Sequence, residues 1–298
     1  MRSRPRKRNK KDRPRSSGGL VSSWARTDVG LKREKNEDSF WEDSNLMCYV
    51  VADGMGGHAA GEKASRMAVE ILRERIREAR NATSPLNTAS DGGESAAVLD
   101  LLQQAIGSAS QKIKHRAEQN PELEGMGTTV TMMLFCDGRA YVAHVGDSRL
   151  YRFSDGRLEQ LTEDHSLVNE QIKAGFITAE EAQFSRYRNI ITRSVGFESE
   201  VTADTFSLVA RPGDVFLLCS DGLTGMVHDE VLRRVLKSGD FDRAASQLIQ
   251  MANQSGGEDN ITLILLRYKG QSGWQAPRPR KAAWRGWRKG IRQASENG

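Results

Sequence analysis

The chain has 298 residues, of which 38% are hydrophobic, and a formal net charge of +5. This length and composition allow one large globular domain or two small ones, each with a substantial buried core. No apolar run approaches the roughly 18 to 20 residues needed to cross a bilayer, so we expect a soluble protein. The cysteines Cys48, Cys136 and Cys219 lie far apart within apolar runs, which favours reduced core thiols in a cytoplasmic protein over a disulfide framework.

The basic residues gather at the two ends of the chain. Residues 1–15 hold nine Lys or Arg residues against one acidic residue, residues 271–298 hold seven against one, and the segment between them is net acidic. The N-terminal basic run is not followed by an apolar stretch, so it does not resemble a signal peptide and we predict no export. We therefore expect a globular domain at 24–268 between disordered basic tails at 1–23 and 269–298.

Within this domain, the hydrophobic pattern predicts both strands and helices. Short runs rich in Val, Ile, Leu and aromatic residues indicate strands, and apolar residues at three- and four-residue spacing indicate helices with one apolar face. In chain order we expect a strand at 47–53, a helix at 62–80, a polar loop at 80–95, a helix at 96–119, strands at 128–135 and 140–147, a short helical insertion at 167–190, and strands at 214–221 and 260–268. The strands cluster more than they alternate with helices, which favours a mixed α+β sandwich over a doubly wound sheet.

Aspartates recur where these strands begin or end. They are Asp38, Asp53, Asp147, Asp221 and Asp259. If those strand ends meet at one edge of the sheets, the carboxylates repel one another unless a divalent cation lies between them. Oxygen ligands without a Cys or His spacing favour Mg²⁺ or Mn²⁺ over zinc. The alternative for any single Asp-Gly pair is an ordinary turn.

The glycine-rich segment after Asp53 allows two interpretations. Gly54, Gly56 and Gly57 precede a predicted helix, as the glycines of a nucleotide-binding loop do, but neither the P-loop ending nor the GxGxxG pattern is present. A tight turn that presents Asp53 is the better interpretation, because a Cβ at these positions would crowd the turn.

Seven segments in order carry a family resemblance. They are GLKREKNEDSF (30–40), VVADGMGGHAAGE (50–62), GTTVTMMLF (127–135), AYVAHVGDSRLYRF (140–153), LTEDHSL (161–167), LLCSDGLTGMV (217–227) and GGEDNITLILL (256–266). Over residues 24–268 the chain resembles the metal-dependent protein phosphatases of the 2C type, in their bacterial form. The resemblance implies an αββα sandwich, in which two packed antiparallel β-sheets are flanked by helices.

The resemblance also implies a metal site that holds two core Mn²⁺ or Mg²⁺ ions. One ion would bind Asp53, Asp221 and Asp259, and the other would bind Asp38, Asp53 and the carbonyl of Gly54, so that Asp53 bridges them. Attack by a metal-bridging hydroxide would then hydrolyse the phosphoester without an enzyme nucleophile.

The resemblance also bears on residues around this metal pair. By the same resemblance, Asp147 and Asp221 would hold a third, weaker ion, and Arg33 would bind the phosphate through its planar guanidinium. The role of Glu37 varies in the family. Met55 stands where other members have a histidine that is thought to protonate the leaving group, so the general acid is open.

The other histidines of the segment are interpreted as structural. His58 suits helix entry or packing. His144 alternates with core residues in its strand, and His165 suits a turn.

The function that follows is hydrolysis of phosphoserine and phosphothreonine in proteins, opposing a bacterial Ser/Thr kinase. Two alternatives are a phosphoprotein-binding fold without turnover and a nucleic-acid or membrane binder that acts through its tails. The insertion at 167–190 matches the family's flap, and we expect it to contribute to substrate choice.

The C-terminal tail permits one more prediction. A helix from about residue 282 would place Trp284, Trp287 and Ile291 on one face, with Arg and Lys residues elsewhere, a pattern suited to anionic lipid. A disordered tail and an acidic partner are the alternatives, and we expect no specific nucleic acid.

Overall fold

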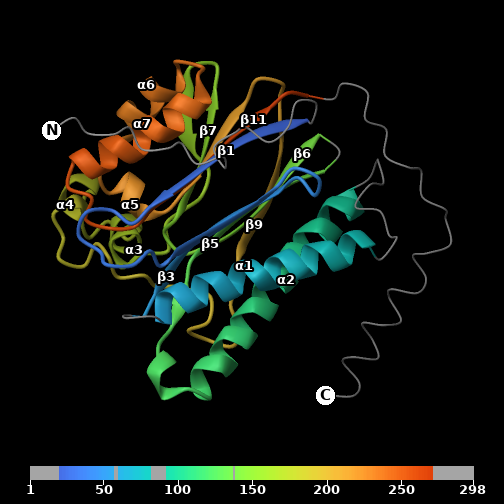
Figure 1. The fold of residues 1–298 in the computed structure, drawn as a ribbon, viewed down its shortest axis with the longest axis vertical. Helices are drawn as coiled ribbons and strands as arrows, with labels where there is room; N and C mark the ends of the chain where they lie inside the picture. The colour runs from blue at the N-terminus through green and yellow to red at the C-terminus, as the bar shows by residue number, and fades with distance from the viewer. Residues whose placement is uncertain (1–19, 57–59, 82–91, 137, 271–298) are drawn as a thin grey trace, which may run out of the picture.

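The computed structural model of the chain describes residues 20–56, 60–81, 92–136 and 138–270. The expectations for the greater part of both basic tails and for His58 therefore lie outside the described residues. Figure 1 shows a layered molecule, with strands of two sheets between helices on opposite sides.

The strands form two antiparallel sheets. The first has the order β1-β11-β10-β7-β8, with bounds Val21–Asp28, Ile261–Tyr268, Val215–Cys219, Arg149–Ser154 and Arg157–Gln160. The second has the order β2-β3-β5-β6-β9, with β4 paired to β3, and bounds Asp38–Asp43, Cys48–Met55, Val130–Cys136, Arg139–Val145, Asp204–Val209 and, for β4, Gly127–Thr128.

Helices cover the outer faces of both sheets (Figure 1). Helices α1 (Ala60–Asn81) and α2 (Gly92–Glu118) pack on the second sheet, and α6 (Asp229–Leu236) and α7 (Phe241–Gln254) pack on the first. Three shorter helices lie together toward one end: α3 (Leu167–Lys173), α4 (Ala179–Gln183) and α5 (Asp221–Thr224). A 3₁₀ turn, η1 (Pro121–Leu123), follows α2. No helix in the described part of the chain has the length and apolar character that spanning a membrane requires.

Strand periodicity explains why the central runs are apolar at every position. In β3, Cys48 and Val50 face the α1/α2 layer, whereas Tyr49 and Val51 face the opposite sheet. Strand β10 follows the same rule, because Leu217 faces the α6/α7 layer and its neighbours face the other sheet. Both faces of these strands are thus buried, so polar residues have no place before the strand ends.

The expected α+β sandwich with the αββα arrangement is confirmed. Several boundaries differ from the prediction: β1 begins at Val21, inside the expected tail, because residues 21–23 pair with Leu266–Tyr268 of β11. Helix α2 begins at residue 92, so it takes up part of the predicted loop at 80–95. Strands β1, β2, β4, β7, β8 and β9 and helices α5, α6 and α7 were not predicted from the sequence.

Candidate functional site

Two of the predicted carboxylates come from neighbouring strands of one sheet. Asp38, the first residue of β2, lies directly opposite Asp53 of β3 in the antiparallel register. The backbone of Asp53 is held on its other side, because its N–H donates to Thr129 Oγ1 at 2.9 Å and its carbonyl accepts from the Thr129 N–H at 2.8 Å. Strand pairing thus fixes the place of both carboxyl groups.

Gly54, which follows Asp53, lies where a side chain would not fit. A Cβ at this position would be 2.1 Å from the carbonyl oxygen of Gly61 and 2.6 Å from that of Glu37. The requirement is close approach of the start of α1 to β3, which agrees with the prediction that a Cβ would crowd this turn.

The other two core carboxylates come from the opposite sheet. Asp221 is the first residue of α5 and lies two residues after the end of β10, and Asp259 lies two residues before β11. A Cβ on Gly222 would be 2.0 Å from the carbonyl oxygen of Asn260, so this Asp-Gly pair also depends on its glycine. The hydroxyl of Ser220 donates to Asp38 Oδ2 at 2.8 Å and thereby joins the two sheets at the carboxylate cluster.

Proximity and burial disfavour negative charge in this cluster. Burial raises the pKa of Asp38 to about 7, and the charges of Asp221 and Asp259 act in the same direction. Burial also raises the pKa of Asp53 well above its ordinary value, with further contributions from Asp38, Asp221 and Asp147. For Asp221, burial raises the pKa as well, although a hydrogen bond shared with Asp53 opposes it. These shifts mean that the ionised cluster is unfavourable unless a cation offsets its charge.

The unpartnered oxygens of the cluster test whether a cation fits there. Among the described residues, the buried Oδ1 atoms of Asp38, Asp147 and Asp221 have no hydrogen-bond partner. Buried carboxylate oxygens without donors are costly, and hard divalent cations satisfy oxygen ligands of this kind. Within the described part of the chain, no group of three or more His, Cys, Asp or Glu side chains is arranged so that it could hold a metal ion as it stands. Some carboxyl oxygens are instead engaged by protein groups, as with Asp38 and Ser220.

Arg33 reaches this cluster from the segment between β1 and β2. Its Nη2 donates to Asp259 Oδ2 at 2.7 Å, and its side chain is half exposed. Glu37 donates its backbone N–H to Asn260 Oδ1 at 2.7 Å, and burial raises the pKa of its carboxyl. Arg33 is thus a cation at the open side of the cluster, and Glu37 links its segment to the Asp259-Asn260 pair.

Asp147 lies in the connection 146–148 between β6 and β7 and is buried. Burial raises the pKa of its carboxyl well above the ordinary value, followed by repulsion from Asp221. The structure therefore brings all five predicted aspartates into one interacting group. Their roles as metal ligands, and that of the Gly54 carbonyl, remain predictions.

Two expectations about histidines have different outcomes. His144 lies in the core as expected, with hydrogen bonds to Thr131 Oγ1 and the carbonyl of Glu163. The interpretation of His165 as a turn residue is wrong, because its ring is buried and bonds Gly146 and Asp204. Its contacts join segments 19 and 39 residues away, so local sequence pattern had no signal for them.

Sequence reasoning also missed residues that support the cluster without being acidic. Ser220, Thr129 and Asn260 place Asp38, Asp53 and Glu37 through the bonds described above. Ser220 and Asn260 stand directly beside predicted ligands in the chain, which is the only sequence signal that could have indicated them.

The insertion at 167–190 is an excursion whose two ends meet. The N–H of Leu167 donates to the carbonyl of Ile190 at 2.9 Å, and Ser166 caps α3 by accepting from the N–H of Asn169. Phe176 and Phe184 within it are 80% and 88% exposed. An ion pair between Arg188 and Glu258 at 3.5 Å connects the insertion to the residue before Asp259.

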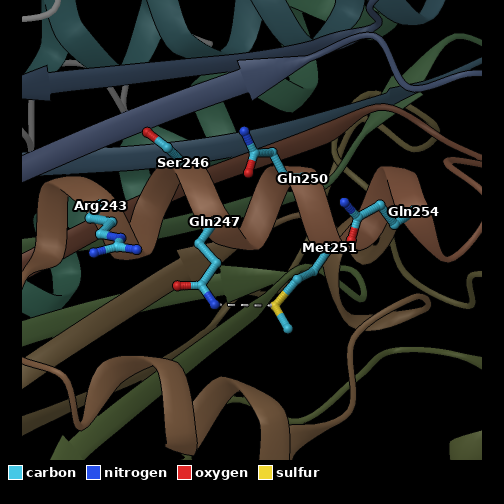
Figure 2. Close-up of a pocket in the computed structure, with 6 residues that line it drawn as sticks. All are labelled: Arg243, Ser246, Gln247, Gln250, Met251 and Gln254. Atoms are coloured by element: carbon cyan, nitrogen blue, oxygen red, sulfur yellow. Dashed lines mark hydrogen bonds between the residues drawn. The ribbon is translucent and has the colours of Figure 1, made fainter.

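A separate hollow lies on the outer side of α7 (Figure 2). All the residues that line it belong to this helix, and they include Arg243, Gln247 and Met251. It contains none of the predicted site residues, so the carboxylate cluster is the better candidate for chemistry.

Comparisons with known proteins all indicate the same family. The family model for protein phosphatase 2C matches residues 32–265. The serine/threonine phosphatase stp of Listeria monocytogenes is 40% identical over 245 residues, covering 81% of this chain and 93% of that protein.

Solved structures agree with this match. The serine/threonine phosphatase PstP/Ppp of Mycobacterium tuberculosis has a TM-score of 0.74 at 37% identity and covers 84% of this chain and 99% of that chain. The catalytic domain of PstP in complex with two manganese ions has a TM-score of 0.73 at 36% identity, with the same coverage. Stp1 of Staphylococcus aureus has a TM-score of 0.75 at 35% identity and covers 87% and 99% of the two chains.

Proposed function

The chain belongs to the protein phosphatase 2C family of metal-dependent serine/threonine phosphatases, and we propose that it hydrolyses phosphoserine and phosphothreonine in proteins at the carboxylate cluster. The observation that carries this proposal is the group of buried carboxyl oxygens without donors, contributed by both sheets at one site. All five predicted aspartates are present, which argues against a phosphoprotein-binding fold that has lost turnover.

Asp38, Asp53, Asp221 and Asp259, with the carbonyl of Gly54, would hold the two core ions, Mn²⁺ or Mg²⁺. When bound, such a pair makes water acidic enough to act as the nucleophile near neutral pH and neutralises charge on the phosphoryl oxygens. The chain's own part is to keep these carboxyl groups close together despite their repulsion, which strand pairing and the Ser220–Asp38 bond accomplish.

Arg33 would bind the phosphoryl group. Its pairing with Asp259 uses Nη2, which leaves further N–H donors of the guanidinium for phosphate oxygens. Because a guanidinium is planar and permanently charged, it orients the phosphoryl group as well as attracting it. Asp259 thus serves to place the arginine at the open side of the cluster.

The test is hydrolysis of a phosphothreonine peptide with Mn²⁺, with and without a chelator, by the full chain and two variants. We expect turnover that the chelator abolishes, loss of turnover in Asp53→Asn, and wild-type turnover in Asp100→Asn, which removes an exposed carboxylate of α2. Turnover that survives chelation, or Asp53→Asn with the wild-type rate, would contradict the assignment.

The flap at 167–190 would contribute to the choice of protein substrate. Its exposed Phe176 and Phe184 offer apolar contacts to a polypeptide, and its ion pair with Glu258 keeps it near the cluster. The proposed partners are a Ser/Thr kinase and its substrates, because a phosphatase of this kind acts on the proteins that such a kinase has modified.

The basic tails support a second, peripheral role. We propose that the C-terminal tail, through Trp284, Trp287 and its Arg and Lys residues, associates with anionic lipid or an acidic partner while the body remains cytoplasmic. Sedimentation of the full chain with anionic vesicles, compared with a chain that ends at Gly270, tests this. Equal amounts of both chains in the supernatant would contradict it.

A further inference from the structure

Two consecutive residues outside the predicted ligand set, Asp164 and His165, contact the two ends of the connection that carries Asp147. This connection, 146–148, lies between β6 and β7, and Arg149 is the first residue of β7. His165 is bonded to Gly146 at its start, and Asp164 is paired with Arg149 directly after its end. Neither Asp164 nor His165 has a role in the proposed chemistry.

His165 is bonded to Gly146 twice. The backbone N–H of His165 donates to the Gly146 carbonyl at 2.8 Å, and the Gly146 N–H donates to His165 Nδ1 at 3.0 Å. Gly146 has a φ of +109°, and a Cβ there would be 2.5 Å from the Thr129 side chain. The backbone immediately before Asp147 is therefore in a conformation that favours glycine, and His165 is bonded to the peptide groups on both sides of the Gly146 Cα.

The orientation of the His165 ring is fixed by its other nitrogen. Because Nδ1 accepts from an amide, the neutral ring carries its proton on Nε2, which donates to Asp204 Oδ2 at 3.0 Å. Asp204 is fixed in turn by Arg193, whose Nη1 lies 2.6 Å from Oδ1. The His165 side chain is only 6% exposed, and the His144 ring packs against it with ring centroids 4.9 Å apart, so the ring is held by protein groups and not by solvent.

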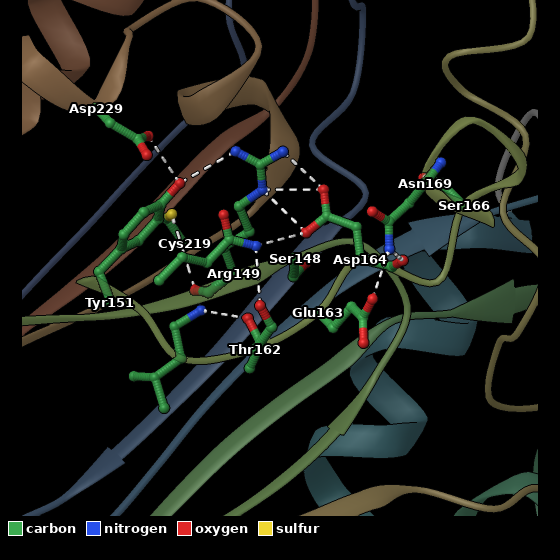
Figure 3. Close-up of polar contacts among 12 residues, drawn as sticks. Ser148, Arg149, Tyr151, Thr162, Glu163, Asp164, Ser166, Asn169, Cys219 and Asp229 are labelled. Carbon is green, nitrogen blue, oxygen red and sulfur yellow. Dashed lines mark hydrogen bonds and ion pairs between the residues drawn. The ribbon is translucent and has the colours of Figure 1, made fainter. Parts of the chain in front are cut away.

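Asp164 holds the other end of the connection through an ion pair with Arg149 (Figure 3). Arg149 Nε lies 3.0 Å from both carboxylate oxygens, and Nη2 lies 2.6 Å from Oδ2. The side chains of Arg149 and Asp164 are 28% and 15% exposed. Such a forked, largely buried contact restrains direction as well as distance.

The carboxyl group between these two ends needs this restraint. Asp147 is 8% exposed, and its Oδ1 has no hydrogen-bond partner within the described chain. No protein donor therefore holds this oxygen in place, so the position of the carboxyl group depends on the backbone that carries it.

We propose that Asp164 and His165 are positioning residues that hold the Asp147 carboxyl group in the cluster. This proposal depends on the proposed function only where phosphatase activity is the readout. The hydrogen bonds to Gly146 and Arg149 do not depend on that function. Asp204 supports this positioning, because its hydrogen bond with Nε2 keeps the His165 ring in the tautomer whose Nδ1 accepts from the Gly146 N–H.

The decisive experiment is a double-mutant cycle between His165→Leu, which keeps bulk but removes both ring bonds, and Asp147→Ala. We expect His165→Leu to lower kcat on a phosphothreonine peptide at least about tenfold with KM changed less than about twofold, and to lower kcat less than about twofold when Asp147 is already Ala. Equal fold-losses in the two backgrounds would overturn the proposal, because His165 would then act independently of Asp147.

Calorimetric titration with Mn²⁺ supplies a readout without turnover. His165→Leu and Asp147→Ala should both lose or weaken the same, weakest Mn²⁺-binding event and keep the tighter ones. His165→Asn should restore part of that binding, because its amide oxygen can accept the Gly146 N–H near the position of Nδ1. Unchanged Mn²⁺ binding in His165→Leu would contradict the proposal even if the wild-type chain proved inactive as a phosphatase, which would itself refute only the proposed function.

Two further variants separate positioning from general loss of stability. Asp214→Asn disrupts another buried carboxylate, which accepts from Arg152 and Ser154 at the end of β7 opposite Arg149, and it should keep wild-type Mn²⁺ binding. If His165→Leu does not fold, Asp164→Asn replaces it in the same cycle. A common effect of Asp214→Asn and the positioning variants on Mn²⁺ binding would overturn the proposal.

Discussion

Removing the charge of Asp38 should stabilise the protein when no divalent cation is present. The pKa of Asp38 is about 7 in the folded chain against an ordinary 3.8. Between these two values the folded chain keeps a proton that the unfolded chain has lost, so stability falls as pH rises through that window. At about 1.4 kcal/mol for each pKa unit, ionisation of Asp38 at pH 8 costs about 4 kcal/mol.

The variant Asp38→Asn avoids this cost and can still accept the hydrogen bond from Ser220. For a domain of this size, about 4 kcal/mol corresponds to a rise in Tm of roughly 10 °C. The assay is thermal and denaturant unfolding in chelator at pH 5 and pH 8, for the wild type, Asp38→Asn and the exposed control Asp100→Asn. We expect a large gain for Asp38→Asn at pH 8, a small gain at pH 5, and none for the control. The same gain at both pH values, or no gain at pH 8, would refute the reasoning.

Four further predictions concern the glycines, the histidines, the metal ligands and the flap. Gly222→Ala should destabilise the fold by about 1 to 3 kcal/mol, since its Cβ would be 2.0 Å from the Asn260 carbonyl; Gly107→Ala, where a Cβ meets no atom within 4 Å, is the control, and equal unfolding midpoints would contradict this. Burial lowers the pKa of His144 to about 4, so the folded chain stays neutral where the unfolded chain is protonated; stability should fall as pH drops from about 6.5 to 4, and His144→Gln should flatten that slope. Asp53→Ala should lose both tight Mn²⁺ sites in calorimetric titration, whereas Asp147→Ala should keep two tight sites and lose most turnover; loss of the tight pair in Asp147→Ala would count against the third-ion assignment. Replacing 167–190 by a short linker between its adjacent ends should spare hydrolysis of a small aryl phosphate but impair phosphopeptide turnover, and an equal loss of both activities would refute a role in recognition.

The sequence predicted the central strands and the acidic cluster because both leave local signals. Strands buried on both faces require unbroken apolar runs, and Asp53-Gly54 and Asp221-Gly222 mark where two such runs stop. Strands β1, β2 and β9 lie at the edges of the sheets with partly exposed residues, so they have no continuous apolar run. Helices α6 and α7 did carry a signal that was missed, namely the spacing of residues such as Leu232, Val235 and Leu236.

Contacts between distant side chains could not be predicted in this way. The Ser220–Asp38 bond joins residues 182 positions apart, and the Arg33–Asp259 pair joins residues 226 positions apart. Hydrophobic periodicity reports only which face of an element is buried. It does not report which polar group meets which, and His165, whose partners lie on two other segments, shows the resulting error.

The pairing of β1 with β11 decides where the basic tails are attached. Val21 lies opposite Tyr268, and the N–H of Lys269 donates to the Leu20 carbonyl at 2.7 Å, whereas the other end of β11 follows Asp259. Eight residues of strand, at about 3.3 Å each, separate this attachment point from the carboxylate cluster by roughly 25 Å. A surface that bound either tail would therefore hold the protein at one end, and the carboxylate cluster would lie at the opposite end, away from that surface.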